Sequence, residues 1–307
     1  MRPSDREAKP GPAMTHLPVL AQEAIDFLQP VSGGVYVDTN LGLGGHSELI
    51  LAASAPAGRV IAFEWDPEAR RRAEARLAPF AGRLTVVPRN FATLAASLAE
   101  LGIGEVDGIV ADLGLSSYQL DESRRGFSFR GDEPLDMRMD PGQGRTAGEL
   151  LSRLSEEELA DIFFYFGEER QARRIAALIV ARRKTQAFKS TAELVSLVEE
   201  AVPRRFHPPR IHVATKVFQA LRIAVNHELD NLLALLESAP QMLKNDAKFC
   251  VLSFHSLEDR LVKRAFAGHP ALEPLTRRPL VASAAELAVN PRARSAKLRV
   301  ARKVEGR

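Results

Sequence analysis

The sequence predicts an α/β fold in which helices cover a doubly wound parallel sheet and a helical module is inserted into the sheet domain. Short apolar strands alternate with helical stretches in the first third of the chain, and a glycine-rich turn follows the first strand. The alternation stops after Leu113. Beyond a glycine- and charge-rich loop from Asp121 to Gly148, apolar residues recur at helical spacing, and strand pattern returns only near residue 248.

Four apolar segments are the predicted strands of the first third: Val35–Asp38, Arg59–Trp65, Leu84–Pro88 and Val106–Leu113. Two later strands are predicted at Lys248–Phe254 and Lys297–Arg302. Between these groups, Leu159, Ile162, Phe163 and Phe166 are typical of the buried face of a helix. The expected domains are therefore a sheet domain of residues 16–125 and 215–307 and an inserted helical domain of residues 126–214.

Composition is that of a well-folded globular protein. The 307 residues suffice for one large core or two smaller ones, and a formal net charge of +3 permits a nucleic-acid partner without requiring one. The single cysteine, Cys250, excludes an internal disulfide framework and suits a reducing compartment. Residues 1–15 are polar and contain prolines, so they are expected to be a disordered lead-in rather than a secretion signal or a membrane span.

The glycine turn after the first strand indicates a ligand. Gly42, Gly44 and Gly45 permit positive φ angles and remove the Cβ atoms that would keep a small molecule away, and a helix opens at Ser47. About twenty residues on, the second strand ends in Glu64, whose carboxylate suits the hydroxyl groups of a ribose. The pattern indicates a nucleoside-bearing cofactor in a βαβ unit, while a tight turn without a ligand explains the glycines equally well.

The fourth strand ends in a second polar group. Asp112 closes the strand and is followed by Ser116, Ser117 and Gln119. Ligands of doubly wound sheets bind at the carboxyl ends of the strands, so these side chains are expected beside the glycine turn. The alternative is a serine or Asx turn that caps a helix.

Three further polar residues allow two interpretations each. His255 follows the strand at 248–254, where it either reaches the cleft or caps the next helix. Asp136 and Arg138 either close over a target or brace their own loop.

The seven histidines have none of the familiar metal-ligand spacings, so no metal is expected.

Long motifs in a fixed order match a known family. They are His16–Leu20, Gly42–Ser47, Asp112–Ser117, Arg125–Phe129, Pro134–Asp140, Tyr165–Glu169, Phe218–Ile223, Ser253–Arg260 and Asn290–Ser295. On these motifs, which extend over nearly everything from His16 to Arg302, the chain resembles the bacterial RsmH (MraW) type of ribosomal RNA methyltransferase. The resemblance implies a Rossmann-like class I methyltransferase sheet with an inserted helical domain. The implied reaction uses S-adenosyl-L-methionine to methylate the N4 amine of a cytidine in small-subunit (16S) ribosomal RNA.

The resemblance also assigns site residues. Gly44, Gly45 and His46 match the contacts to the methionine end of the cofactor, and Glu64 matches the ribose position. Phe91 matches the adenine side, and Asp112 and Gln119 match the remaining cofactor contacts. The implied partner is small-subunit ribosomal RNA or the 30S subunit, in the cytoplasm and without a membrane, and a homodimer is left open.

This chain departs from the family pattern at four positions. Glu64 stands where aspartate is usual, Asn40 where threonine is usual, Leu43 where glycine is usual, and Val213 where proline is frequent. Glutamate keeps the charge of aspartate but adds one methylene. Ribose binding is therefore expected to survive with altered geometry.

The chemistry of a cytosine N4 amine sets its own demands. The nitrogen lone pair is delocalised into the ring, so the site must orient the amine toward the methyl donor and accept hydrogen bonds from its protons. We expect Asp112, Ser116 or Ser117 to be that acceptor, and His255 to be a further catalytic candidate. Methylation at carbon 5 would need a thiolate, and Cys250 lies in an apolar strand pattern typical of a core residue.

Clustered cations indicate RNA contact in and beside the helical insertion and near the carboxyl end. They are Arg170, Arg173 and Arg174; Arg182, Arg183 and Lys184; Arg204, Arg205 and Arg210; and Arg292, Arg294, Lys297 and Arg299. For each cluster the alternative is a solvated face paired with acids such as Glu168 and Glu169. Two competing functions stay open: a methyltransferase acting on a different substrate, and a non-catalytic RNA-binding protein.

Overall fold

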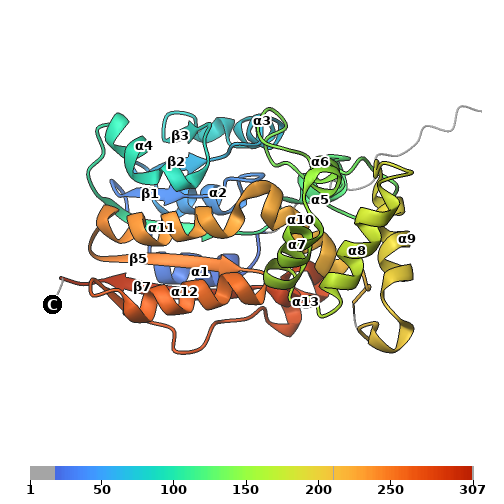
Figure 1. Cartoon of the computed structure of the whole chain (residues 1–307). Helices are drawn as coiled ribbons and strands as arrows, with labels where there is room; N and C mark the ends of the chain where they lie inside the picture. Colours follow the sequence, from blue (N-terminus) through green and yellow to red (C-terminus); the bar gives the residue numbers. More distant parts are fainter. Residues whose placement is uncertain (1–17, 210, 306–307) are drawn as a thin grey trace, which may run out of the picture.

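The computed structural model describes residues 18–209 and 211–305 (Figure 1). The predicted lead-in of residues 1–15, together with His16, Leu17 and Arg210, lies outside the described residues. Within the described ranges, no helix combines the length and the apolar character that crossing a membrane requires.

A seven-stranded sheet forms the centre of the larger part of the molecule. Its strands are β1 (Val35–Asp38), β2 (Arg59–Phe63), β3 (Leu84–Val87), β4 (Val106–Asp112), β5 (Leu243–Ser253), β6 (Leu272–Pro274) and β7 (Lys297–Lys303). They lie in the order β3-β2-β1-β4-β5-β7-β6, with β1 to β5 parallel and β7 antiparallel to both of its neighbours. The predicted α/β fold is confirmed, and the strand order is that of the class I methyltransferase sheet which the resemblance implies.

The six predicted strands are all present, with small differences at their ends. β5 begins at Leu243 rather than Lys248, and its pairing with β4 shifts register between Val106 and Gly108. The prediction omitted β6, which is three residues long and ends in a proline. A segment this short carries too little alternation to be recognised.

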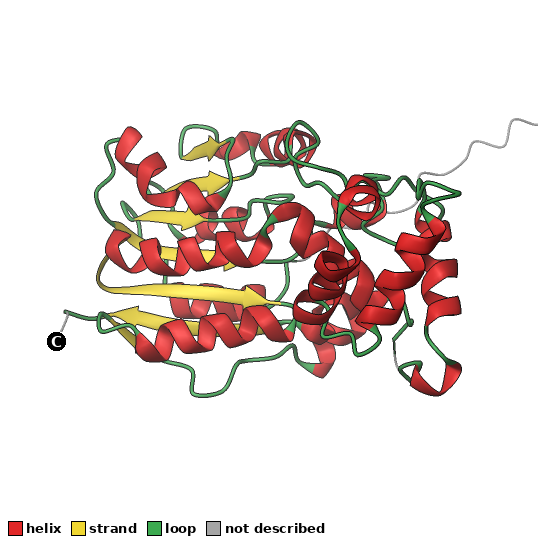
Figure 2. Cartoon of the chain, in the orientation of Figure 1, coloured by secondary structure: helices red, strands yellow, loops and turns green. Residues whose placement is uncertain are grey.

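Helices cover both faces of the sheet, as Figure 2 shows in red around the yellow strands. One face carries α1 (Ala21–Leu28), α2 (Gly45–Ala53) and α3 (Pro67–Arg76), whose apolar residues share a core with Tyr36 and Cys250. The other face carries α4 (Leu94–Glu100), α11 (Glu228–Met242) and α12 (Ser256–Gly268), which pack on Val37 and Phe249. Alternate residues along each strand thus serve opposite cores, as expected for a doubly covered sheet.

The inserted helices gather beyond one end of the sheet (Figure 1). They are α6 (Ala147–Arg153), α7 (Glu156–Asp161), the π-helical turn η3 (Ile162–Phe166), α8 (Ala172–Arg182), α9 (Thr191–Ala201) and α10 (Thr215–Asn226). A third core joins them and contains Phe163, Ile175 and Leu197. Val217, Phe218 and Leu221 of α10 belong to the same core, which therefore extends beyond the boundary predicted at residue 214.

Candidate active site

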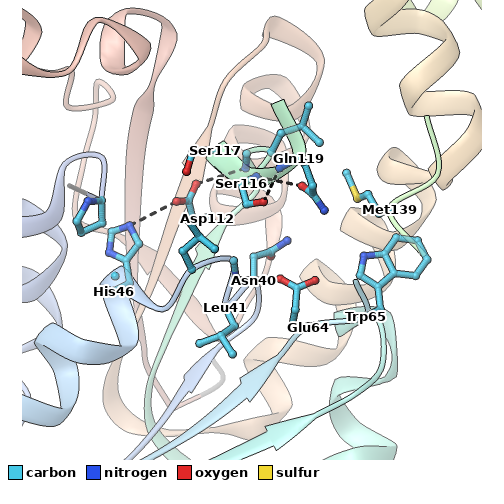
Figure 3. A pocket seen from close by; sticks show the side chains of 16 residues that line it. Asn40, Leu41, His46, Glu64, Trp65, Asp112, Ser116, Ser117, Gln119 and Met139 are labelled. Atoms are coloured by element: carbon cyan, nitrogen blue, oxygen red, sulfur yellow. Dashed lines mark hydrogen bonds and ion pairs between the residues drawn. The ribbon is translucent and has the colours of Figure 1, made fainter. Parts of the chain in front are cut away.

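A cleft opens at the carboxyl ends of β1 and β4, between which the strand order of the sheet reverses. β1 and β4 are neighbours, β2 and β3 lie on one side of them, and β5 lies on the other. Residues after β1, β2 and β4 line a space of about 630 Å³, which includes volume open to solvent. Figure 3 shows Asp112 and His46 on one side of this cleft, Trp65 and Met139 on the other, and Asn40 and Glu64 between them. This is the position at which doubly wound sheets bind ligands.

The glycine turn forms as predicted, and two of its glycines pack closely against neighbouring side chains of the protein. Gly42 and Gly44 have φ angles of +54° and +85°, which disfavour side chains. A Cβ atom on Gly44 would lie 2.8 Å from a methyl carbon of Leu77, and one on Gly45 would lie 3.1 Å from Pro18. Gly44 and Gly45 therefore make room for neighbouring side chains, and the expectation that the glycines also make room for a ligand stays a prediction.

His46 lies in the first turn of α2, buried between two carboxylates. Its Nε2 atom is 3.5 Å from Oδ2 of Asp112, and neither ring nitrogen has a hydrogen-bond partner among the described residues. Burial alone would lower the pKa of His46, but Asp112 and Asp38 together raise it above its ordinary value. Nε2 faces the Asp112 carboxylate, whereas Nδ1 has neither a hydrogen-bond nor an ion-pair partner among the described residues, which is uncommon for a buried polar atom.

Glu64, at the end of β2, points into the same cleft (Figure 3). Its carboxylate accepts hydrogen bonds from the backbone N–H groups of Gly42 and Asp66, each at 2.9 Å. These bonds favour the charged form, yet burial outweighs them and raises the pKa of Glu64 to about 8. The carboxyl group therefore carries a proton at neutral pH in the absence of a ligand.

The polar group after β4 combines an available acceptor with a helix cap. Asp112 is partly exposed, and its Oδ1 accepts a bond from the N–H of Gly114 at 3.3 Å. Ser116 caps α5 (Ser117–Asp121), because its Oγ accepts from Gln119 N–H while Gln119 Oε1 accepts from Ser116 N–H. The capping alternative is thus present, and Asp112, Ser116 and Gln119 still line the cleft together with Ser117.

A second cavity of about 360 Å³ adjoins the first. Asn40, Trp65 and Met139 line both cavities, and Phe91 and Leu113 add apolar walls to the second. The predicted adenine-side residue Phe91 is therefore next to the main cleft rather than in it. The two cavities together offer a polar end and an apolar end.

A buried ion pair connects Asp66, at the start of α3, to Arg125, which immediately precedes the inserted module. Asp66 caps α3 through Oδ1, and its Oδ2 accepts from Gln119 Nε2 at 3.0 Å and from the guanidinium of Arg125. Arg125 also donates to the carbonyl oxygens of Arg138 and Met139 at 2.8 and 2.7 Å. Asp66 is 1% exposed, so this pair is shielded from water. The network fixes the backbone of Met139 over the cleft.

Asp136 and Arg138 brace their own loop. The Arg138 guanidinium makes two bonds to the Asp136 carboxylate, at 2.7 and 2.9 Å. Burial opposes the charge on Asp136, but the bonds from Arg138 prevail and lower its pKa. Neither residue lines the main cleft, so the bracing interpretation describes the geometry.

His255 lies outside both cavities and caps α12. Its Nδ1 accepts from Glu258 N–H at 3.4 Å, and its Nε2 lies 3.1 Å from Glu258 Oε1. Glu258 lines the second cavity, so His255 reaches that cavity only through Glu258. The structure does not bring His255 to Asp112, and its catalytic role stays a prediction.

Glu228, His255 and Glu258 form a group whose spacing would suit a metal ion. Both oxygens of Glu228 already accept bonds from Arg222, each at 2.7 Å. Glu258 accepts from the N–H groups of Phe254 and His255. Since these carboxylates have partners within the chain, the group is explained without a metal.

Cys250 lies in the middle of β5 and is fully buried. Burial raises the pKa of its thiol to about 12. A thiol with this pKa supplies almost no thiolate near neutral pH. The prediction that Cys250 is a core residue is confirmed.

Asn40, Trp65 and Met139 are among the lining residues that were not predicted as part of the site from the sequence. Asn40 was noted only as a departure from the family pattern, although it follows β1 directly. Trp65 was predicted as the last residue of the second strand, but this strand ends at Phe63, which leaves Trp65 in the segment that lines the cleft. Met139 comes from the inserted segment, and nothing in its local sequence indicates that the chain folds back over the sheet.

Comparison with known proteins agrees with these features. A family model described as the MraW methylase family matches residues 13–304. The Ribosomal RNA small subunit methyltransferase H of Desulfotalea psychrophila is 53% identical over 289 residues, which cover 94% of this chain and 98% of the relative. A protein with the same description from a Cyanothece species is 50% identical, over 99% of this chain and 99% of the relative. Another, from Geotalea uraniireducens, is 47% identical, over 94% of this chain and 98% of the relative.

Loss of the Arg125 guanidinium should strongly destabilise the protein. Arg125→Ala leaves the Asp66 carboxylate buried without its cationic partner, which costs about 3–5 kcal/mol. Chemical denaturation followed by circular dichroism measures the change. Arg71→Ala, which removes an exposed ion pair with Glu68, is the matched control and should leave stability nearly unchanged. Equal stability of the two variants would contradict the role assigned to Arg125.

Proposed function

This chain belongs to the MraW methylase family, and we propose that it transfers a methyl group from S-adenosyl-L-methionine to the N4 amine of a cytidine in small-subunit ribosomal RNA. One observation carries the proposal. His46 and Glu64, which follow β1 and β2, and Asp112, which ends the neighbouring β4, line a single cleft beside a glycine turn. The cleft thus offers separate groups for a nucleoside and for a reacting amine.

The residues present suit this cofactor. His46 lines the cleft beside Asp112 and suits the polar methionine end, and the buried carboxyl of Glu64 suits a ribose diol. Phe91, Leu113 and Trp65 offer apolar surfaces to an adenine. Gln119 uses both ends of its amide within the chain, so its main contribution is to hold Asp66 and Ser116. When bound, S-adenosyl-L-methionine supplies an electrophilic methyl group.

The chain itself has to position the amine and accept its proton. Asp112 is the best acceptor, because its carboxylate is partly exposed in the cleft and only Oδ1 accepts a backbone bond. The hydroxyl of Ser117 also lines the cleft and has no partner among the described residues. A hydrogen bond from the amine to Asp112 fixes the direction of the nitrogen lone pair, and the proton can leave along the same bond once the methyl group has arrived.

Two alternatives remain distinguishable from this proposal. A methyltransferase for another substrate would bind the cofactor and leave small-subunit RNA unmodified, and a non-catalytic RNA-binding protein would bind RNA without the cofactor. Neutralising Arg182, Arg183 and Lys184 is not a clean test of RNA contact, because Arg182 pairs with Glu200 and Arg183 bonds to two backbone carbonyls. The proposed substrate belongs to the cytoplasm, and a homodimer stays a prediction.

The product of the purified enzyme tests the function directly. Small-subunit RNA incubated with the enzyme and labelled S-adenosyl-L-methionine should yield N4-methylcytidine, identified by mass spectrometry after nuclease digestion. Cys250→Ala should give the same product at nearly the same rate, because the thiol is buried in β5. A 5-methylcytidine product that disappears in this variant would overturn both the proposed position of methylation and the role of Cys250.

Cofactor affinity should rise with pH through the Glu64 carboxyl. The free enzyme holds a proton on this group below a pKa of about 8, whereas two ribose hydroxyls donate to the ionised form. Binding then releases a proton, so affinity should rise about tenfold or more from pH 6.5 to 8.5. Titration calorimetry in buffers of different ionisation enthalpy measures affinity and proton release together. Glu64→Gln should lose this part of the pH dependence, and an unchanged slope in that variant would exclude Glu64 as its source.

Removal of the Asp112 carboxylate should slow the transfer step. Asp112→Ala should lower kcat about a hundredfold or more, because the amine loses its positioning acceptor. Single-turnover assays at saturating cofactor separate this effect from weaker cofactor binding. Asp121→Ala, at an exposed pair with Arg292, is the control and should retain full turnover. Full turnover of Asp112→Ala at normal cofactor affinity would rule out the role.

A further inference from the structure

The helical module carries an exposed hollow lined by both aromatic and cationic side chains. Phe164 and Tyr165 of η3 line it together with Arg170, Arg173 and Arg174, and we call these five residues the aromatic–arginine surface. The hollow encloses about 810 Å³, which includes volume open to solvent. It is separate in its lining from the cleft that holds Asp112.

The π-helical turn explains why two adjacent aromatic rings face outward. Phe163 is fully buried in the core of the module, whereas Phe164 and Tyr165 are 54% and 62% exposed. Their rings meet edge to face, with centroids 5.2 Å apart. Burial of such rings in the core would contribute to stability, and π-helical turns occur frequently at functional sites. Two large rings held at the surface by this backbone indicate a partner.

The charges beside the rings are available to a partner. Arg170, Arg173 and Arg174 are exposed, and none of them has an acidic partner among the described residues. Asp161 is the one carboxylate in the lining, so the cations are in excess. The two glutamates expected to neutralise them are engaged elsewhere: Glu168 binds Ser256 and Arg260, and Glu169 is buried and accepts from the Gln171 N–H.

Several cations of the other clusters pair with acids, and Arg205, which has no acidic partner among the described residues, lies over the single exposed ring of Phe206. Arg182 pairs with Glu200, Arg292 pairs with Asp121, and Lys297 and Arg299 share Asp259. Free cations beside two exposed rings are thus a specific property of the aromatic–arginine surface. Phosphate groups are the complementary charge, and nucleobases are the complementary partner for exposed rings.

We propose that the aromatic–arginine surface is a second RNA contact, which stacks unpaired bases of the substrate on Phe164 or Tyr165 and binds the adjoining phosphates with the three arginines. This inference rests on the proposed function, because it assigns a place to the RNA that the cleft modifies. Glu168 follows η3 and ties it to α12 through bonds of 2.9 Å to Ser256 and to Arg260. RNA held on the surface is therefore held at a fixed position relative to the sheet domain.

Replacement of both rings tests the stacking. The Phe164→Ala/Tyr165→Ala double variant should bind a twelve-nucleotide single-stranded RNA about tenfold or more weakly in filter binding, since each stacked base contributes about 1–3 kcal/mol. Its KM for small-subunit RNA should rise by a similar factor, with kcat and cofactor affinity unchanged. Phe206→Ala is the matched control, because Phe206 is another exposed ring beside an arginine, and it should behave like the unmodified enzyme. Phe164→Trp/Tyr165→Trp keeps both stacking faces and should restore binding.

Salt dependence tests the arginines independently. Arg170→Gln/Arg173→Gln/Arg174→Gln should reduce the slope of log affinity against log salt by about two, the value for three phosphate contacts to a single strand. Unchanged RNA affinity and KM in the ring and arginine variants, or an equal loss in Phe206→Ala, would overturn the proposal. A change in sedimentation instead of RNA affinity would identify the surface as a contact between copies of the chain and would likewise overturn it. RNA binding through this surface without methyl transfer by the unmodified protein would overturn the proposed function alone.

Discussion

The candidate site depends on one buried carboxylate. Asp66 caps α3, accepts from Gln119 in the segment after β4, and pairs with Arg125 at the start of the inserted segment. Its own N–H donates to Glu64. The start of α3 and the segment that contains Gln119 and Arg125, which lie 53 or more residues apart in sequence, are therefore fixed against one another around a single side chain. Because the pair is shielded from water, its attraction is strong, and loss of either partner leaves a buried charge uncompensated.

This arrangement divides the work between two modules. The sheet places His46, Glu64 and Asp112 through the ends of parallel strands, and the inserted segment completes the cleft with Met139. The substitution of glutamate for the usual aspartate at position 64 fits within this frame, since the longer side chain reaches back to the N–H of Gly42. The glycine turn thus accommodates the longer side chain, while the ionised carboxylate becomes available to a ligand only when Glu64 loses its proton.

The sequence predicts the sheet well because each buried strand is visible in the sequence as a short apolar segment. Val35–Asp38 was predicted to the residue, and the ends of the other predicted strands of the first third differ by one or two positions. The polar residues after β1, β2 and β4 were predictable for the same reason, since parallel strands bring their carboxyl ends together. Residues such as Arg125 and Met139 were not, because their positions depend on contacts across the two modules. From an isolated motif, a residue that caps a helix cannot be told apart from a catalytic residue. Ser116 and His255, which both cap helices, are examples.

The single tryptophan of the chain stands at the junction of the two cavities. Trp65 is half-buried there, with Asn40 and Met139 lining the same two spaces. Indole emission depends on local polarity and on nearby quenching groups, and no other indole contributes to the spectrum. The intrinsic fluorescence of this protein is therefore a built-in optical reporter of whatever fills or leaves the cleft, with no label attached.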